Sequence, residues 1–301
     1  MKFRLMLIII IIFSIFILFK KTNYENFTLN FHKNKIAFIF LTVGNIKQIN
    51  IWKEFFKDKE DLYNIYIHPK YPYLIDKSFQ KYIINKTIST RWGDISLVNA
   101  TKLLIKEALK DNLNKKIILV SDSCIPIKSF DYIYKNVLVD NKSWFNFYKP
   151  NFNNGSREHL RRLYLFNEKI RKYIHITDQW MILDRQHALS IIKNKQLDHL
   201  FLKPRLIPDE MYFISMLHLI NPNIKKQLKF KILNHNEYIK HNKITYAKWY
   251  DPELQKLENL HPIEFNKLKK NDLINLKKSK CLFARKFSKK SDIYKYWKYI
   301  I

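Results

Sequence analysis

Glycine, proline and cysteine are scarce in this chain, and each scarcity excludes a kind of protein. Three glycines and nine prolines among 301 residues leave no long flexible linker visible. Two cysteines, Cys124 and Cys281, are too few for a disulfide scaffold or a four-thiolate zinc site, although they could pair in an oxidising lumen. The ten histidines are scattered, without a close pair at metal-ligand spacing. The sequence therefore indicates a globular protein without a zinc site.

Acidic residues are also few relative to basic ones, which gives a net charge of +29. One interpretation is a polyanionic partner, such as nucleic acid or an acidic membrane surface. The basic residues are dispersed, however, and no nucleic-acid-binding motif accompanies them, so we favour a charge spread over every solvated face. With 47% hydrophobic residues, the chain can bury the core of one large domain or two small ones.

An uncharged apolar run lies near the N-terminus, where Leu5–Phe19 contains Ser14 as its only polar residue. At about 1.5 Å per residue the run spans roughly 22 Å, which is short for a bilayer core of about 30 Å but suits thin secretory-pathway membranes. No small-x-small cleavage site follows it. We interpret residues 1–21 as a short end plus an uncleaved signal anchor, 22–34 as a stem and 35–301 as the body. Similar charge on both sides specifies the orientation weakly.

Short apolar runs alternate with helical patterns along the body. This alternation predicts an α/β fold with a mostly parallel sheet that is covered on both faces. Ligands of such sheets bind beyond the carboxyl ends of the strands. The predicted strands are 36–41, 62–67, 117–120, 144–148, 179–183 and 245–249, and the predicted helices are 51–56, 96–109, 185–192, 211–220 and 264–276. We therefore predict a nucleotide at the first three strand ends, in contact with Thr42, Val43, Gly44, His68 and Asp122.

Two carboxylates, Asp209 and Glu210, follow Pro208 and precede the predicted helix at 211–220. One interpretation places them in the first helical turn, where the helix dipole favours acids. The other makes Glu210 a catalytic base at the mouth of a cleft. Arginines are frequent between 157 and 171, and the sequence does not decide whether they are solvated or contact a substrate.

Seven short motifs occur in order between residues 35 and 288. They are IAFIFLT at 36–42, YIHP at 66–69, RWGD at 91–94, SDSCIP at 121–126, QW at 179–180, PDE at 208–210 and CLFARKF at 281–287. Their order and spacing resemble the core-2/I-branching family of glycosyltransferases (glycosyltransferase family 14-like), including its plant-type members. The resemblance implies a GT-A-like nucleotide-binding fold in a single-pass type II membrane protein, with a luminal catalytic domain in the Golgi or another secretory-pathway compartment.

The resemblance also implies a reaction. Such enzymes transfer a sugar from a UDP donor with inversion and without a metal, typically N-acetylglucosamine in a β1,6 branch of a glycan or glycoprotein. Xylose and glucuronic acid are the alternative sugars. Glu210 matches the family's base, and Lys286 matches one of two cations that replace the metal. Where the family has the second cation, an arginine, this chain offers only Lys243, so Lys243 or Arg285 could take its place.

The same residues make chemical sense on their own. A sugar hydroxyl is a poor nucleophile, and a carboxylate that accepts its proton accelerates the reaction by roughly 10²–10⁴-fold. A leaving diphosphate gains negative charge, which lysine and arginine stabilise where no metal does. No Asp-x-Asp triplet occurs, the nearest stretch being Asp58-Lys59-Glu60. We therefore expect no metal and no cofactor beyond the UDP-sugar substrate.

We predict Asp209, Trp180 and Trp92 as contacts of the donor or acceptor sugar. The expected partners are a UDP-sugar, a glycan or glycoprotein acceptor, and a membrane through the N-terminal helix, without nucleic acid. The alternative is a membrane-tethered basic protein that binds nucleic acid or another polyanion without catalysis.

Overall fold

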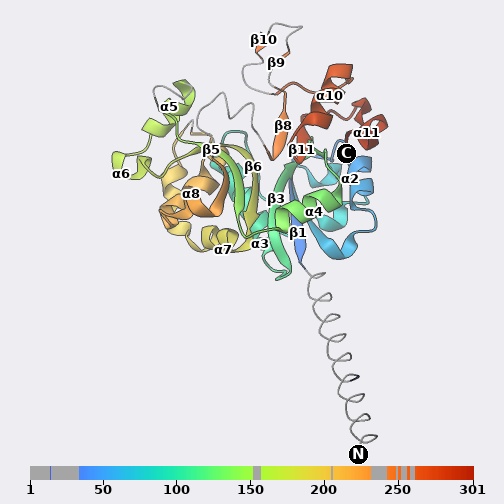
Figure 1. The fold of residues 1–301 in the computed structure, drawn as a ribbon. Helices are drawn as coiled ribbons and strands as arrows, with labels where there is room; N and C mark the ends of the chain where they lie inside the picture. Colours follow the sequence, from blue (N-terminus) through green and yellow to red (C-terminus); the bar gives the residue numbers. More distant parts are fainter. Residues whose placement is uncertain are drawn as a thin grey trace, which may run out of the picture.

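A six-stranded mixed sheet forms the centre of the molecule (Figure 1). The computed structural model describes residue 14 and residues 34–151, 157–204, 206–231, 243–248, 250–251, 256–257 and 262–301. In spatial order, the strands are β2 (Tyr63–Pro69), β1 (Lys35–Thr42), β3 (Asn114–Ser121), β6 (Ile176–Asp184), β5 (Ser143–Tyr148) and β7 (Leu228–Lys231).

Five of these six strands run in one direction, and β6 runs against them. β1 pairs in parallel with β2 and β3, and β5 pairs in parallel with β7, while β6 lies antiparallel between β3 and β5. The predicted α/β class with a mostly parallel sheet is thus confirmed. The carboxyl ends of β1, β2 and β3 meet at one edge, where β6 begins.

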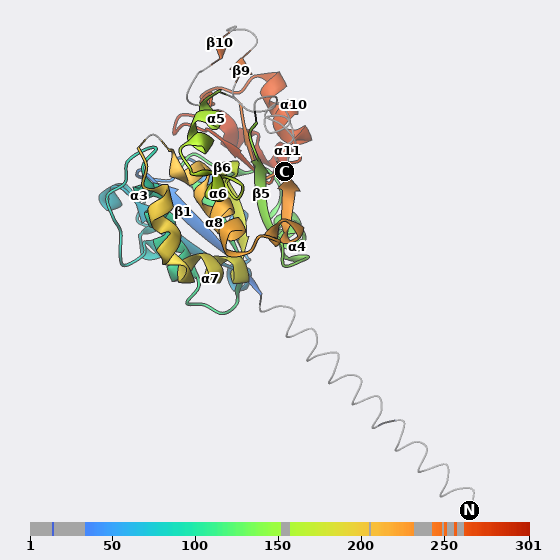
Figure 2. The same cartoon turned by 90° about the vertical axis from the view of Figure 1, so that its left-hand side faces the viewer.

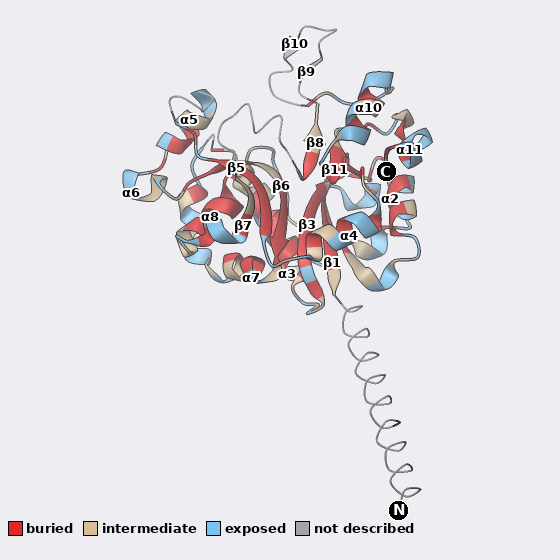
Figure 3. Cartoon of the chain, in the orientation of Figure 1, coloured by how far each residue is buried: buried red, intermediate tan, exposed pale blue. Residues whose placement is uncertain are grey.

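Both faces of the sheet are buried because successive side chains of a strand point to opposite sides. In β1, Phe38 and Phe40 face one apolar layer while Ala37 and Ile39 face the other, and all four are fully buried. Figures 2 and 3 show the helices on either side of the buried sheet. The first layer includes α2 (Ile49–Phe56) and α4 (Phe130–Leu138), and the second includes α3 (Ile95–Ala108), α7 (Arg185–Lys193) and α8 (Tyr212–Ile220).

A three-stranded sheet attaches the C-terminal part of the chain to the end of β3. β11 (Phe283–Arg285) pairs antiparallel with β4 (Ile125–Pro126) and parallel with β8 (Thr245–Ala247). The aromatic tail packs there as well, since the indole N–H of Trp297 donates to the Pro126 carbonyl at 2.8 Å. This arrangement carries residues 283–287 to the carboxyl ends of the central strands.

The remaining elements are short and lie around this framework. The helices are α5 (Arg157–Tyr164), α6 (Glu168–Arg171), α10 (Lys270–Lys278) and α11 (Trp297–Ile300), and β9 (Tyr250–Asp251) pairs with β10 (Lys256–Leu257). The 3-10 turns are η1 (Glu60–Leu62), η2 (Pro72–Leu74), η3 (Gln80–Tyr82), η4 (Lys195–Phe201), η5 (Pro208–Glu210), η6 (Ile224–Gln227) and η7 (Asp292–Lys295).

Two expectations from the sequence need correction or completion. The helix predicted at 264–276 begins only at Lys270, because the Phe265 N–H donates to the Lys286 carbonyl at 2.8 Å and is therefore committed to a β-bridge region. Cys124 and Cys281, whose pairing the sequence left open, are both buried free thiols.

The predicted anchor at Leu5–Phe19 falls outside the described residues except for Ser14. Within the part of the chain that is described, no helix combines the length and the apolar character needed to cross a membrane.

Candidate active site

Glu210 ends the single 3-10 turn η5, which packs against α3 and β6. Ile207, just before the turn, has a left-handed backbone with φ of 52°, which is unfavourable for a β-branched residue and must be held by its surroundings. Met211, with φ of −140° and ψ of −36°, then interrupts the helical conformation before α8 begins. Asp209 and Glu210 therefore lie in a helical turn that begins at Pro208, but this turn is separate from the buried helix α8. The Glu210 side chain is 34% exposed.

Arg162 of α5 holds the Glu210 carboxylate. Its Nη1 lies 2.5 Å from Glu210 Oε2, and its Nε lies 3.2 Å from Glu158 Oε1. The Arg162 side chain is only 7% exposed, so this charge-assisted hydrogen bond forms with little competition from water. Arg161 binds Glu158 through two N–H groups, and the hydrogen bond from Arg161 lowers the pKa of Glu158 to about 2 despite partial burial. Arg162 therefore orients Glu210, and Arg161 holds Glu158 beside it.

Asp209 points inward beside Glu210. Burial, followed by the negative charge of Glu210, raises the pKa of the Asp209 carboxyl to about 7. Its Oδ1 is buried and has no hydrogen-bond partner among the described residues. Below that pH Asp209 is mostly protonated, so it can act as a hydrogen-bond donor.

A groove of about 470 Å³ opens next to this carboxyl pair, and we call it the Trp92 groove. It is lined by Trp92, Gly93, Glu158, Arg161 and Ile207. Ile207 immediately precedes η5 and Glu158 shares Arg162 with Glu210, so the groove adjoins the candidate base. The Trp92 side chain is 63% exposed. Its indole offers the flat apolar face on which a sugar ring can stack.

A second cluster gathers around Asp122, just beyond the end of β3. Burial raises the pKa of Asp122, while the charge of Lys47, a hydrogen bond from the Val43 backbone, and the charges of Arg285 and Lys286 act in the opposite direction. The Lys47 N–H also donates to the Asp122 carbonyl at 2.8 Å. Lys47 also pairs with Glu264 at 3.1 Å, so three cations here face two carboxylates, and the remaining positive charge suits a further anion.

Backbone hydrogen bonds and an aromatic ring hold Arg285 and Lys286 in this cluster. The Phe287 N–H donates to the Ser123 carbonyl at 3.0 Å, which ties the end of β11 to the turn that contains Asp122. The Arg285 guanidinium lies over the buried Trp180 ring, 4.7 Å from its centroid. Arg285 Nε is buried and lacks a hydrogen-bond partner among the described residues.

Lys243, the other candidate cation, lies elsewhere. Arg285 pairs with Ala247 in the β8–β11 ladder, and Lys243 precedes Ala247 by a distance of roughly 13 Å along an extended strand. Its N–H donates to Asn146 Oδ1 at 3.3 Å, and its charge acts on the thiol of Cys281. Of the two residues left open by the sequence, Arg285 is the one that the fold brings to Lys286 and Asp122.

Three residues at the end of β1 were predicted to contact a nucleotide. Val43 is 58% exposed, whereas Thr42 and Gly44 are buried. Thr42 Oγ1 has no hydrogen-bond partner within the described part of the chain. A Cβ on Gly44 would lie 2.9 Å from Leu74 Cδ1, so a larger residue there would require the Leu74 side chain to move. Val43 is therefore the residue of this group that presents a side chain to a ligand.

His68, at the end of β2, has a structural position. Its side chain is fully buried, and its Nε2 accepts a hydrogen bond from the Ile88 N–H at 3.0 Å. Burial lowers the pKa of His68, which keeps the ring neutral as this hydrogen bond requires. His68 thus holds the segment that follows β2, and its burial argues against the predicted contact with a nucleotide.

No metal site can be assembled from the side chains that the structure describes. Among these residues, no group of three or more His, Cys, Asp or Glu is placed to hold a metal ion. The metal independence expected from the sequence concerns the reaction itself and stays a prediction.

Each of the two clusters can contribute a step of a group transfer. The carboxylate of Glu210 can accept a proton from a nucleophile, and the cations around Asp122 can stabilise a departing anion. Both clusters depend on β6, since Trp180 supports Arg285 and η5 packs against the same strand. Fold and site define an α/β enzyme of the group-transfer class.

Comparison with known proteins identifies the family. The sequence model of the core-2/I-branching enzyme family matches residues 36–273. The chain therefore belongs to this family and is a glycosyltransferase, as its motifs indicated. It is similar to glycosyltransferase BC10 of rice, Oryza sativa subsp. japonica, with 22% identity over 307 residues that cover 85% of this chain and 74% of the rice protein.

Sequence reasoning missed Lys47 and the role of Arg162. Nothing in the sequence distinguishes Lys47 from the many other lysines, and only the fold brings it to Asp122. Glu158, Arg161 and Arg162 were detectable in principle, because positions three and four residues apart share one face of a helix.

Proposed function

We propose that this glycosyltransferase transfers a sugar from a UDP donor to a glycan or glycoprotein acceptor, with inversion and without a metal ion. The observation that carries the proposal is the combination of one partly exposed carboxylate, Glu210, with a separate cationic cluster at Arg285 and Lys286. We favour N-acetylglucosamine in a β1,6 branch, and xylose and glucuronic acid are the alternative sugars.

In the proposed reaction, Glu210 accepts the proton of the acceptor hydroxyl as its oxygen attacks the anomeric carbon. The bond from that carbon to the diphosphate oxygen breaks, and the electron pair leaves with UDP. Arg285 and Lys286 stabilise the charge that grows on the diphosphate. One base and no carboxylate nucleophile correspond to a single displacement, which inverts the configuration.

The neighbouring residues have supporting roles in this proposal. Trp92 provides a face for the acceptor sugar, Arg162 positions Glu210, and Asp209 donates a hydrogen bond to a sugar hydroxyl. UDP lies at the strand ends near Val43 and Asp122. The Trp180 ring packs against the Arg285 guanidinium and does not itself contact the sugar.

We also propose that Leu5–Phe19 anchors the enzyme in the membrane of the Golgi or another secretory-pathway compartment, with the catalytic body in the lumen. The support is the apolar run itself and the lack of a cleavage site after it.

A screen of nucleotides and nucleotide sugars tests the proposed function. Thermal unfolding is measured with UDP, UDP-N-acetylglucosamine, UDP-xylose, UDP-glucuronic acid and, as control, GDP, and donor hydrolysis is followed in parallel. We expect UDP to raise Tm where GDP does not, because a ligand that binds only the native state stabilises it. Indifference to UDP together with steeply salt-dependent binding of DNA or heparin would instead favour the polyanion-binding alternative.

A further inference from the structure

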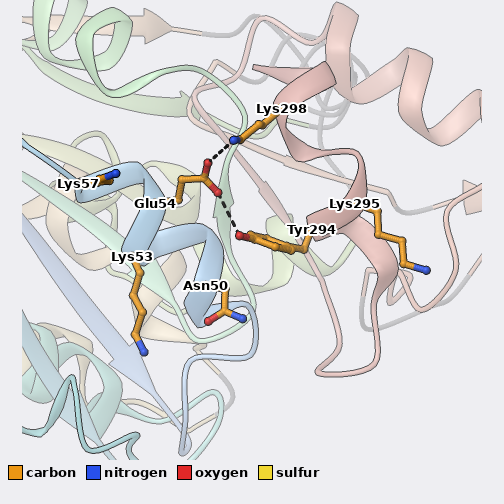
Figure 4. Close-up of a pocket in the computed structure, with 7 residues that line it drawn as sticks. All are labelled: Asn50, Lys53, Glu54, Lys57, Tyr294, Lys295 and Lys298. Atoms are coloured by element: carbon orange, nitrogen blue, oxygen red, sulfur yellow. Dashed lines mark hydrogen bonds and ion pairs between the residues drawn. The ribbon is translucent and has the colours of Figure 1, made fainter.

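A second groove, of about 720 Å³, lies between α2 and the C-terminal elements η7 and α11 (Figure 4). We call it the α2 groove, and its charged and aromatic lining residues are Lys53, Glu54, Lys57, Tyr294, Lys295 and Lys298. α2 belongs to the apolar layer opposite the one that contains α3, against which η5 packs. The α2 groove is therefore separate from the Trp92 groove, and no role of Glu210 depends on it.

The lining of the α2 groove carries an excess of positive charge. Its four lysines face one glutamate, which gives a net charge of +3. Lys298 Nζ lies 2.8 Å from one oxygen of Glu54, and the Tyr294 hydroxyl donates to the other at 3.2 Å. The hydrogen bond from Lys298 is the main cause that lowers the pKa of Glu54, so this carboxylate is ionised and already compensated. Lys53 Nζ lies 3.7 Å from Asp76 Oδ1, outside the lining, so the charges of Lys57 and Lys295 are the ones that remain in excess within the groove.

We propose that the α2 groove binds an anionic glycan, a polysaccharide with carboxylate or sulfate groups repeated along its chain. The lysine side chains come from both walls and point in different directions instead of converging on one spot (Figure 4). Such a spread suits several charges along an extended ligand better than one phosphate ion. Tyr294 is 49% exposed, and its ring adds a surface on which a sugar can stack.

Shape and composition separate this ligand from other polyanions. A bilayer presents a flat surface, whereas these lysines line a concave groove with no exposed aliphatic side chain among them to insert into lipid. Nucleic-acid grooves favour arginine, whose planar fork matches phosphate, and the lining residues include none. Lysine acts as a point charge and suits carboxylates and sulfates equally well.

The test compares two variants that lose the same charge from different places. Lys57→Gln and Lys295→Gln are combined in one variant, and Lys53 and Lys298 are kept so that Asp76 and Glu54 stay paired. The matched control combines Lys115→Gln and Lys135→Gln, two exposed lysines on β3 and α4. Binding of a heparin oligosaccharide and of an oligogalacturonate is measured at about 150 mM salt, where non-specific attraction over long distances is screened.

We expect the groove variant to bind both oligosaccharides at least about 10-fold more weakly, and the control variant to lose less than about 3-fold. Equal losses in the two variants would overturn the proposal, since they would assign binding to the net charge of the whole protein. A larger loss for single-stranded DNA or for phosphatidylserine vesicles than for the oligosaccharides would overturn the ligand class. Thermal unfolding and the effect of UDP on Tm, measured on both variants, report folding and the nucleotide site independently, so failure here is distinguishable from failure of the transferase proposal.

Discussion

Arg162 donates a hydrogen bond to Glu210 at 2.5 Å from a guanidinium that is almost wholly removed from solvent. The contact engages Oε2 of the carboxylate, and the Glu210 side chain is 34% exposed. The same arginine also binds Glu158, which lines the Trp92 groove. One buried side chain therefore links the proposed base to the wall of the proposed acceptor groove. Substitution of Glu210 and of Arg162 tests this relationship.

Glu210→Gln keeps the size of the side chain but cannot accept a proton. We expect kcat to fall by at least about 10²-fold, while UDP raises Tm as it does in the wild type, because the donor site is intact. Glu168→Gln, at the exposed start of α6, is the control and should behave as the wild type. Near-normal turnover in Glu210→Gln would remove Glu210 from the reaction.

Replacement of Arg162 should disturb the orientation of Glu210 more than the binding of donor. Arg162→Met removes both charge and fork, and we expect kcat to fall about 10–100-fold, as expected for misplacement of a reacting group. Arg162→Lys keeps the charge but loses the planar fork of donors, so its kcat should lie between that of the wild type and that of Arg162→Met. A change confined to KM, with kcat unaffected in both variants, would assign Arg162 to substrate binding instead of positioning. Tm of each variant reports whether the fold survives.

The raised pKa of Asp209 predicts a pH dependence of stability. An aspartate in the unfolded chain titrates near about 4, whereas burial raises the pKa of Asp209 to about 7 in the native state. The native state binds the proton more tightly, so this contribution to stability is complete below about pH 4 and is lost as the pH rises to about 7. Asp209→Asn should remove that slope. The free energy of unfolding, measured by urea at several pH values, decides the matter, and parallel curves for the two proteins would contradict the predicted pKa.

The fold was more predictable than the site. The spacing of apolar residues along the sequence indicates which residues are buried, but not which distant residues come close together. The continuous apolar run of β1 and the helical spacing in α3 predicted both elements, since both lie in a core that excludes polar side chains. The antiparallel direction of β6 leaves no such trace, because a strand buried on both faces has the same pattern in either direction.

Site residues were predictable where a motif carried them. Glu210, Arg285 and Lys286 lie in the quoted motifs, and the fold brings the last two close enough for their charges to act on Asp122. The proximity of Lys47 to Asp122 depends on a loop that folds back onto the end of β3, and the buried position of His68 depends on a hydrogen bond to Ile88. Neither relationship has a signal in the order of residues along the chain.

The apolar run at Leu5–Phe19 predicts a membrane topology. If it is a signal anchor with a luminal body, protease added to sealed microsomes should leave residues 35–301 intact and remove only the short N-terminal end. Detergent should then make the body accessible, which is the control for protection. Digestion of the body in sealed microsomes, or secretion of a shortened protein, would contradict the anchor.

The final prediction concerns Lys286 and the metal. Three cations surround Asp122, and the chain contains no Asp-x-Asp triplet, so we expect the wild type to keep full activity in excess EDTA. Lys286→Ala should weaken UDP binding and reduce kcat/KM by about 2–4 kcal/mol of transition-state stabilisation, by analogy with the loss of one oxyanion donor. Lys289→Ala, an exposed lysine three positions further along, is the matched control.

The response to added metal distinguishes the explanations. If Mn²⁺ partly restores Lys286→Ala but does not affect the wild type, a cation fills the place of the lost ammonium group, as expected where lysine takes the role of a metal. If EDTA abolishes the wild-type activity and Mn²⁺ or Mg²⁺ restores it, the metal-free mechanism is wrong. Lys286 would then be a surface charge near the site, and Asp122 would become the first residue to test as a metal ligand, because it is the carboxylate at the end of β3 that the cations surround.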